Sequence, residues 1–160
     1  MAILLSEDEQ VKSSFKLLFV KDQVKKKPSM SWISYKVLLK SAEKELIFEK
    51  KSNNNGAGDY VLALKPINEI ESIINGTKSF LQSETSKMFS FEPIEPSFEL
   101  ILERAHKGYS VICWMDSGNV VSDHYTWDGL GIRFFTSEEK ILSFVKELEK
   151  EKEELLSKNA

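Results

Sequence analysis

The sequence is poor in the residues that build covalently linked or metal-held scaffolds. Cys113 is the only cysteine among 160 residues, so the chain can form no internal disulfide and no cysteine-rich metal site. Only two histidines are present, His106 and His124, which leaves few candidates for a general base or a metal ligand. Because Cys113 lies in the middle of a predicted strand, we expect it to be a small buried apolar side chain.

Long apolar runs and an excess of positive charge are also missing. The first apolar run covers only residues 2–5, which is shorter than a signal peptide requires, and no stretch is long enough to span a bilayer. The formal net charge is −3, whereas general nucleic-acid binders usually carry a basic surface. We therefore expect a cytoplasmic protein that binds neither membranes nor nucleic acid.

The length and composition are those of one globular domain. The chain is 41% hydrophobic and 29% charged, which is enough apolar material for a core and enough charge for a solvated surface. We expect a single domain over residues 1–160, in which residues 1–13 and 150–160 are peripheral or frayed.

The stretch from Phe89 to Asp116 is the centre of the predicted fold. Residues 97–104 alternate between apolar and mostly polar positions, and residues 109–116 alternate in a similar way. A period of two is typical of a strand with one buried face. Gly108 supplies the tight turn that would join these two strands as an antiparallel hairpin.

The remaining elements are read from the same kinds of pattern. Strands are predicted over residues 14–20, 32–40, 45–50, 60–64 and 131–135. An isoleucine stripe predicts a short helix over 67–75, which Asn75 and Gly76 would end or interrupt. Thr136 and Glu139 have capping-box spacing at the start of a final helix. The prediction is an α+β fold: an antiparallel meander sheet of seven or eight strands, a mid-chain crossover helix and a C-terminal helix packed on the sheet.

No residue pattern in the chain is typical of an enzyme. His124 lies between Asp123 and Tyr125, but no serine or cysteine has the context of an activated nucleophile. The aspartates around His124 match neither a calcium-binding loop nor a zinc-binding helix. The alternating glutamates Glu99 and Glu103 fit a solvated strand face better than an acid–base pair. We expect no catalysis, no metal and no cofactor, and a small histidine–carboxylate hydrolase is the less favoured alternative.

The segment from Asp116 to Asp128 is the best candidate for a binding surface. It combines carboxylates with aromatic side chains, the usual make-up of protein–protein hot spots. The alternative for its tryptophan is burial at the start of the last strand. The expected partner contacts are Asp116, Asp123, His124, Tyr125, Trp127 and Asp128, with Trp114, Glu99 and Glu103 as second choices.

Several short motifs resemble the WapI-like family of bacterial immunity proteins, the antitoxins paired with wall-associated and contact-dependent polymorphic toxins. The motifs lie within residues 32–150. They are the phenylalanine-rich strand that runs through residues 92–96 into Phe98-Glu99-Leu100, the turn at 127–129, and the strand 132–134 that leads into a capped helix. This chain departs from the pattern in its longer N-terminal segment and its charged C-terminal tail.

The resemblance implies a function in which the protein turns over no substrate. It implies that the protein binds a cognate protein toxin domain and blocks its active site. We expect the protein itself to be a monomer or weak dimer. It also implies that the toxin is a nuclease with a basic cleft, which a mildly acidic inhibitor would suit. The alternative is a structural or adaptor module that binds a different protein.

Overall fold

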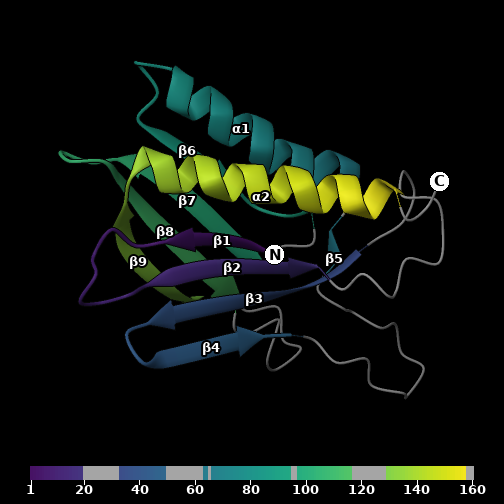
Figure 1. Cartoon of the computed structure of the whole chain (residues 1–160), viewed down its shortest axis with the longest axis horizontal. Helices are drawn as coiled ribbons and strands as arrows, with labels where there is room; N and C mark the ends of the chain where they lie inside the picture. Colours follow the sequence, from purple (N-terminus) through teal and green to yellow (C-terminus); the bar gives the residue numbers. More distant parts are fainter. Residues whose placement is uncertain (20–32, 50–62, 65, 95–96, 117–128, 158–160) are drawn as a thin grey trace.

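The computed structural model describes residues 1–19, 33–49, 63–64, 66–94, 97–116 and 129–157. These residues form two antiparallel β-sheets and two α-helices, so the predicted α+β class is confirmed (Figure 1). The strands form two sheets, and each sheet is built mainly from consecutive strands. The apolar faces of both sheets are turned toward one shared core.

The first sheet is a meander with one added short strand. Its strands are β1 (Ala2–Leu5), β2 (Ser14–Phe19), β3 (Ile33–Ser41) and β4 (Lys44–Phe48), in the order β1-β2-β3-β4, while β5 (Ala63–Leu64) also pairs with β3. All these pairings are antiparallel.

The second sheet contains the stretch that the sequence marks as central. It consists of β6 (Met88–Phe91), β7 (Phe98–Arg104), β8 (Tyr109–Asp116) and β9 (Gly129–Thr136), in the order β6-β7-β8-β9. The predicted hairpin of β7 and β8 is confirmed. Gly108 has a φ of +85°, a left-handed conformation that glycine adopts at little cost.

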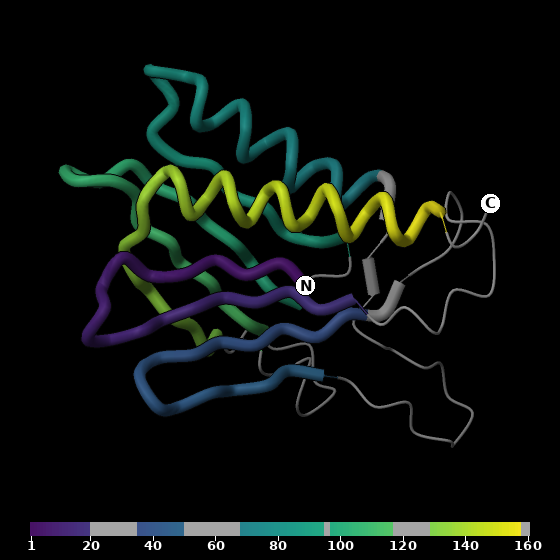
Figure 2. The backbone as a smooth tube through the Cα atoms, viewed as in Figure 1, coloured from purple at the N-terminus to yellow at the C-terminus, as the bar shows by residue number. Residues whose placement is uncertain are grey.

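Two helices run antiparallel and side by side along the strands (Figure 2). A π-helical turn, η3 (Pro66–Ile70), leads directly into α1 (Glu71–Gln82), and α2 (Glu138–Ser157) follows the last strand. The pairing of the helices is reinforced by an ion pair of 2.9 Å between Lys152 Nζ and Glu71 Oε1. Within the described residues, neither helix offers a stretch that is long and apolar enough to cross a membrane.

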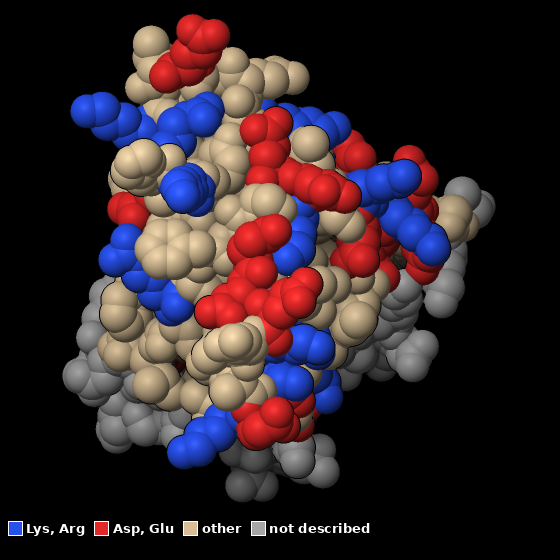
Figure 3. Space-filling view, turned by 60° about the vertical axis from the view of Figure 1, so that its left-hand side comes forward, with Lys and Arg blue, Asp and Glu red and all other residues tan. Residues whose placement is uncertain are grey.

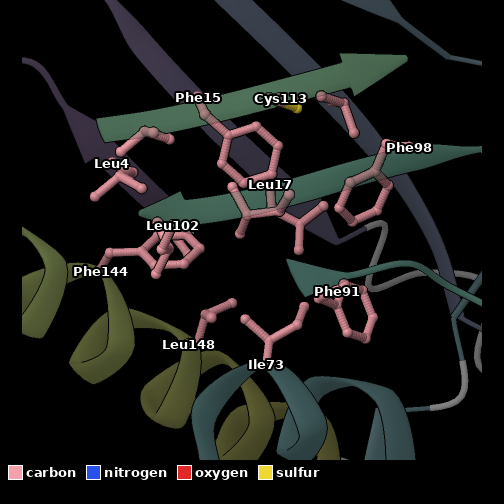
Figure 4. Packing of buried hydrophobic residues seen from close by; sticks show 14 of the residues in the cluster. Leu4, Phe15, Leu17, Ile73, Phe91, Phe98, Leu102, Cys113, Phe144 and Leu148 are labelled. Carbon is pink, nitrogen blue, oxygen red and sulfur yellow. The ribbon is translucent and has the colours of Figure 1, made fainter. Parts of the chain in front are cut away.

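Three phenylalanines show how the two sheets and the C-terminal helix meet in the core. The ring centroid of Phe15 on β2 lies 5.9 Å from that of Phe98 on β7 and 6.0 Å from that of Phe144 on α2 (Figure 4). These are distances at which aromatic rings pack favourably. The predicted packing of the final helix on the sheet strands is therefore confirmed. Cys113 is buried in the same core, as expected, and this burial raises the pKa of its thiol.

The mid-chain helix is longer than the sequence suggests. It continues through Asn75 and Gly76 to Gln82, so the prediction that these two residues end the helix is wrong. Gly76 serves packing instead, because a Cβ at this position would overlap the ring of Phe89 on β6. The glycine lets α1 approach the second sheet closely.

Both chain ends, which the sequence predicts to be peripheral, contain buried side chains in the part that the structure describes. Ala2 and Leu4 on β1 are fully buried, and Leu155 near the end of α2 is buried as well. The reason is that β1 pairs with β2 and packs against α2, where the backbone N–H of Ile3 donates to Glu147 Oε2 at 2.8 Å.

The start of α2 differs from the predicted capping box. Thr136 is the last residue of β9, and its hydroxyl donates to the backbone carbonyl of Leu5 at 2.7 Å. The helix begins two residues later, and the carbonyl of Ser137 accepts the N–H of Ile141. Thr136 therefore ties β9 to β1.

Candidate protein-binding surface

One face of the second sheet is turned away from the core. Burial alternates along β7 and β8, so that one set of side chains packs with the helices while the other set points outward. We call the outward set the outer face. Its residues are Met88, Ser90, Glu99, Ile101, Glu103, Ser110, Ile112, Trp114, Arg133 and Phe135.

Trp114 lies on β8, one of the two central strands of the outer face. It is directly opposite Glu99 on β7 and Gly131 on β9. A Cβ at Gly131 would come within 2.5 Å of Trp114 Cε3, so the indole ring lies over the glycine. Such a pairing of an aromatic ring with a strand glycine is a known way to cover the glycine and fix strand register. The side chain is nevertheless 42% exposed.

Two further large apolar side chains are exposed on the same face. Phe135 and Met88 are each 54% exposed, while Ile101 and Ile112 in the neighbouring row of the sheet are half-buried. By register, Met88 and Phe135 lie at opposite ends of a row that crosses the sheet through Glu103 and Ser110. Each of the four strands therefore contributes an apolar side chain to the outer face. Exposed apolar side chains gathered on one face are common where a protein binds another macromolecule.

The charged groups of the outer face are held by neighbouring side chains. Arg133 Nε donates to Ser110 Oγ at 3.0 Å, and Arg133 Nη2 lies 3.9 Å from Glu103 Oε2. The guanidinium also lies over the Phe135 ring, 5.8 Å from its centroid. On the other side of Trp114, Ser90 Oγ donates to Glu99 Oε1 at 3.0 Å. The carboxylates of Glu99 and Glu103 on β7 and the guanidinium of Arg133 on β9 therefore lie on the two sides of β8, the strand that carries Trp114.

The predicted contact residues have three different outcomes. Trp114, Glu99 and Glu103, the second choices, share the outer face. Asp116 is only 5% exposed, and its N–H donates to the carbonyl of Ser97 at 3.0 Å. The first-choice residues Asp123, His124, Tyr125, Trp127 and Asp128 lie outside the described residues.

The sequence interpretation missed the other members of this surface, among them Phe135, Met88 and Arg133. Arg133 and Phe135 alternate with Ile132 and Phe134, which is a signal for one shared face. That signal does not say which face is buried, because Phe134 and Phe135 are equally apolar. The structure shows that Phe134 enters the core and Phe135 does not.

Charge elsewhere on the molecule is mixed. On the side shown in Figure 3, acidic side chains form a broken band with basic side chains on both sides of it. In the described part of the chain, no three His, Cys, Asp or Glu side chains come together in a way that would hold a metal ion. Comparisons with protein-family models, with curated proteins and with solved structures find no match to this chain.

Proposed function

We propose that this protein is an immunity protein, a stoichiometric inhibitor that neutralises a bacterial toxin domain by binding over its active site. The observation that carries the proposal is the outer face, where Trp114 lies exposed over Gly131 on β9 and opposite Glu99 on β7. The resemblance of the sequence motifs to WapI-like immunity proteins supports the same class. The role requires tight binding and no turnover of a substrate.

The outer face has the composition of a binding hot spot. Tryptophan and arginine are enriched among residues that dominate binding energy, and both occur here. Trp114 is held over Gly131 and Arg133 is held by Ser110 and Glu103, so neither side chain has much conformational freedom left to lose on binding. Less ordering on association leaves more of the contact energy as affinity.

The charge of the surface favours a basic partner. Glu99 and Glu103 stand on the outer face, and the whole chain has a formal net charge of −3. Toxins that cleave nucleic acid need a basic cleft to hold phosphates. Opposite charges accelerate encounter and disfavour wrong partners, so we propose a nuclease domain as the target.

Co-expression tests this function directly. The C-terminal domain of a large secreted protein encoded beside this gene is produced with and without the chain, and surviving cells are counted. We expect growth to be restored and the two proteins to co-purify at one to one. If growth stays arrested and the domain does not co-purify, the immunity function is wrong and the adaptor alternative takes its place.

Two matched variants connect the function to the surface. Trp114→Ala should abolish or strongly weaken rescue, because it removes the central aromatic contact. Leu142→Ala removes an exposed apolar side chain from α2 and should rescue as the wild type does. Equal rescue by both folded variants would show that the toxin binds elsewhere.

A further inference from the structure

Two rows of the outer face share one arrangement of side chains. In the first, which we call the Glu103 row, Glu103 on β7 and Phe135 on β9 lie on the two sides of β8. In the second, the Glu99 row, Glu99 on β7 and Gly131 on β9 lie on the two sides of Trp114. The indole ring of Trp114 lies over Gly131, so each row has a carboxylate on β7 and an aromatic ring at β9.

The Glu103 row holds a guanidinium beside both its carboxylate and its ring. Arg133 Nη2 lies 3.9 Å from Glu103 Oε2, and Arg133 Cζ lies 5.8 Å from the ring centroid of Phe135. Arg133 Nε donates to Ser110 Oγ at 3.0 Å, which directs the side chain toward this row. A cation in such a place is attracted both by the carboxylate and by the face of the ring.

The Glu99 row has the carboxylate and the ring but no cation from the described part of the chain. Ser90 Oγ donates to Glu99 Oε1 at 3.0 Å, and no described lysine or arginine forms an ion pair with this carboxylate. Glu99 and Glu103 are four residues apart, about 13 Å along a strand, so Arg133 cannot contact both carboxylates at once. The Trp114 side chain is 42% exposed, so a cation from outside can reach the ring.

Arginine fits the Glu99 row better than lysine does. The Trp114 ring leans toward β9, over Gly131, whereas the Glu99 carboxylate leans toward Ser90 on β6. A wide planar group can span these two side chains more easily than a compact ammonium. A guanidinium is planar, weakly hydrated and able to stack on an aromatic face while its N–H groups donate to a carboxylate. Among the aromatic side chains, tryptophan binds cations best.

We infer that Trp114 and Glu99 together bind one arginine side chain of the protein partner. This inference rests on the proposed function and names the group that the outer face recognises. In the complex, the partner's guanidinium takes the place in the Glu99 row that Arg133 has in the Glu103 row. An arginine that holds phosphate in a nuclease cleft has the required chemistry, because the same planar fork binds phosphate and carboxylate. Binding it here would withdraw it from the nucleic acid.

The affinity for the toxin domain used in the co-expression experiment tests the role of Glu99. Glu99→Gln should weaken binding about tenfold or more, because the partner's guanidinium then lacks its carboxylate. Glu103→Gln is the matched control and should weaken binding less than about threefold, since Arg133 already pairs with that carboxylate. Equal urea midpoints would show that both variants fold. If the wild type binds and the two variants lose affinity equally or not at all, the arginine site is wrong while the proposed function stands. If the wild type neither binds nor rescues, both fail together.

A double-mutant cycle tests whether the two side chains bind the same group. Trp114→Leu keeps an apolar side chain but removes the ring that attracts a cation. Combined with Glu99→Gln, it should weaken binding less than about threefold beyond the more severe single variant, because both changes act on one arginine. Each arginine of the toxin domain is then replaced in turn by lysine. One replacement should weaken binding to the wild type but not to the double variant. Additive losses, or the lack of such an arginine, would overturn the inference.

Discussion

Replacing Arg104 should destabilise the fold, because its side chain binds the backbone carbonyls at the end of α1. It lies at the end of β7 beside the C-terminus of α1, where its Nη2 donates to the carbonyls of Phe80, Leu81 and Ser83 at 3.0, 3.2 and 2.7 Å. Its Nε donates to the carbonyl of Ser86 at 3.0 Å. The last carbonyls of a helix have no partner within the helix, and a cation there also interacts favourably with the helix dipole.

The expected loss can be worked out from these contacts. A hydrogen bond to a charged group contributes about 1.5–3 kcal/mol, but Arg104 is exposed, so water can replace much of each bond. The helix-dipole interaction adds about 0.3–1 kcal/mol. The guanidinium also lies 5.2 Å from the Phe80 ring centroid and 5.5 Å from that of Tyr109, contacts worth about 0.5–1 kcal/mol at exposed sites. We expect Arg104→Ala to lower the free energy of unfolding by about 2–3 kcal/mol.

Urea unfolding with a matched arginine control measures this loss. Arg133→Ala removes the chain's other arginine from the outer face, where its side chain is 60% exposed, and should cost less than about 1 kcal/mol. Arg104→Lys keeps the charge but loses the planar fork, so it should fall between the wild type and Arg104→Ala. The reasoning is refuted if Arg104→Ala and Arg133→Ala shift the urea midpoint equally at unchanged slope.

Three further measurements follow from individual side chains. Thr77 Oγ1 is buried without a hydrogen-bond partner among the described residues, so Thr77→Val should raise the free energy of unfolding by about 1 kcal/mol, and a loss of stability would contradict this. Burial raises the pKa of the Cys113 thiol, so the thiolate is scarce at neutral pH; the thiol should react with a disulfide reagent only as fast as the protein unfolds, and rapid reaction in the native state would show it to be accessible. In a chain whose Trp32 and Trp127 are replaced by phenylalanine, Gly131→Val should displace the Trp114 ring and shift its fluorescence toward that of solvated indole, whereas an unchanged spectrum would mean that the ring does not lie over the glycine.

The hairpin of β7 and β8 could be predicted because its pattern is local. The alternation along both strands predicts which face of the sheet each side chain occupies, and Gly108 at the turn predicts that the two strands pair. The same alternation placed Glu99 and Trp114 on one face, which is why part of the candidate surface was visible in the sequence. These features depend on neighbours in the chain and on little else.

The features that the sequence did not reveal depend on distant contacts. In the sequence, Gly76 has the appearance of a helix end, and only the structure shows that the Phe89 ring occupies the space of a Cβ at this position. The short apolar run of β1 carries too few residues to signal a core strand, and its burial arises from α2. The hydrogen bond from the Ile94 N–H to Glu69 Oε1 joins residues 25 positions apart, and no periodicity connects them.

The contact of β1 with α2 has a consequence for biosynthesis. Ile3 is held by Glu147, 144 residues further along the chain, so the edge of the first sheet is completed only when α2 has been translated. Such non-local closure slows folding, because loop entropy is lost before the contact forms. A ribosome-bound chain that lacks α2 can pair β1 with β2, but its Ile3 N–H lacks Glu147 and the apolar surface that α2 covers is exposed. The native fold would then be complete only once α2 has left the ribosome.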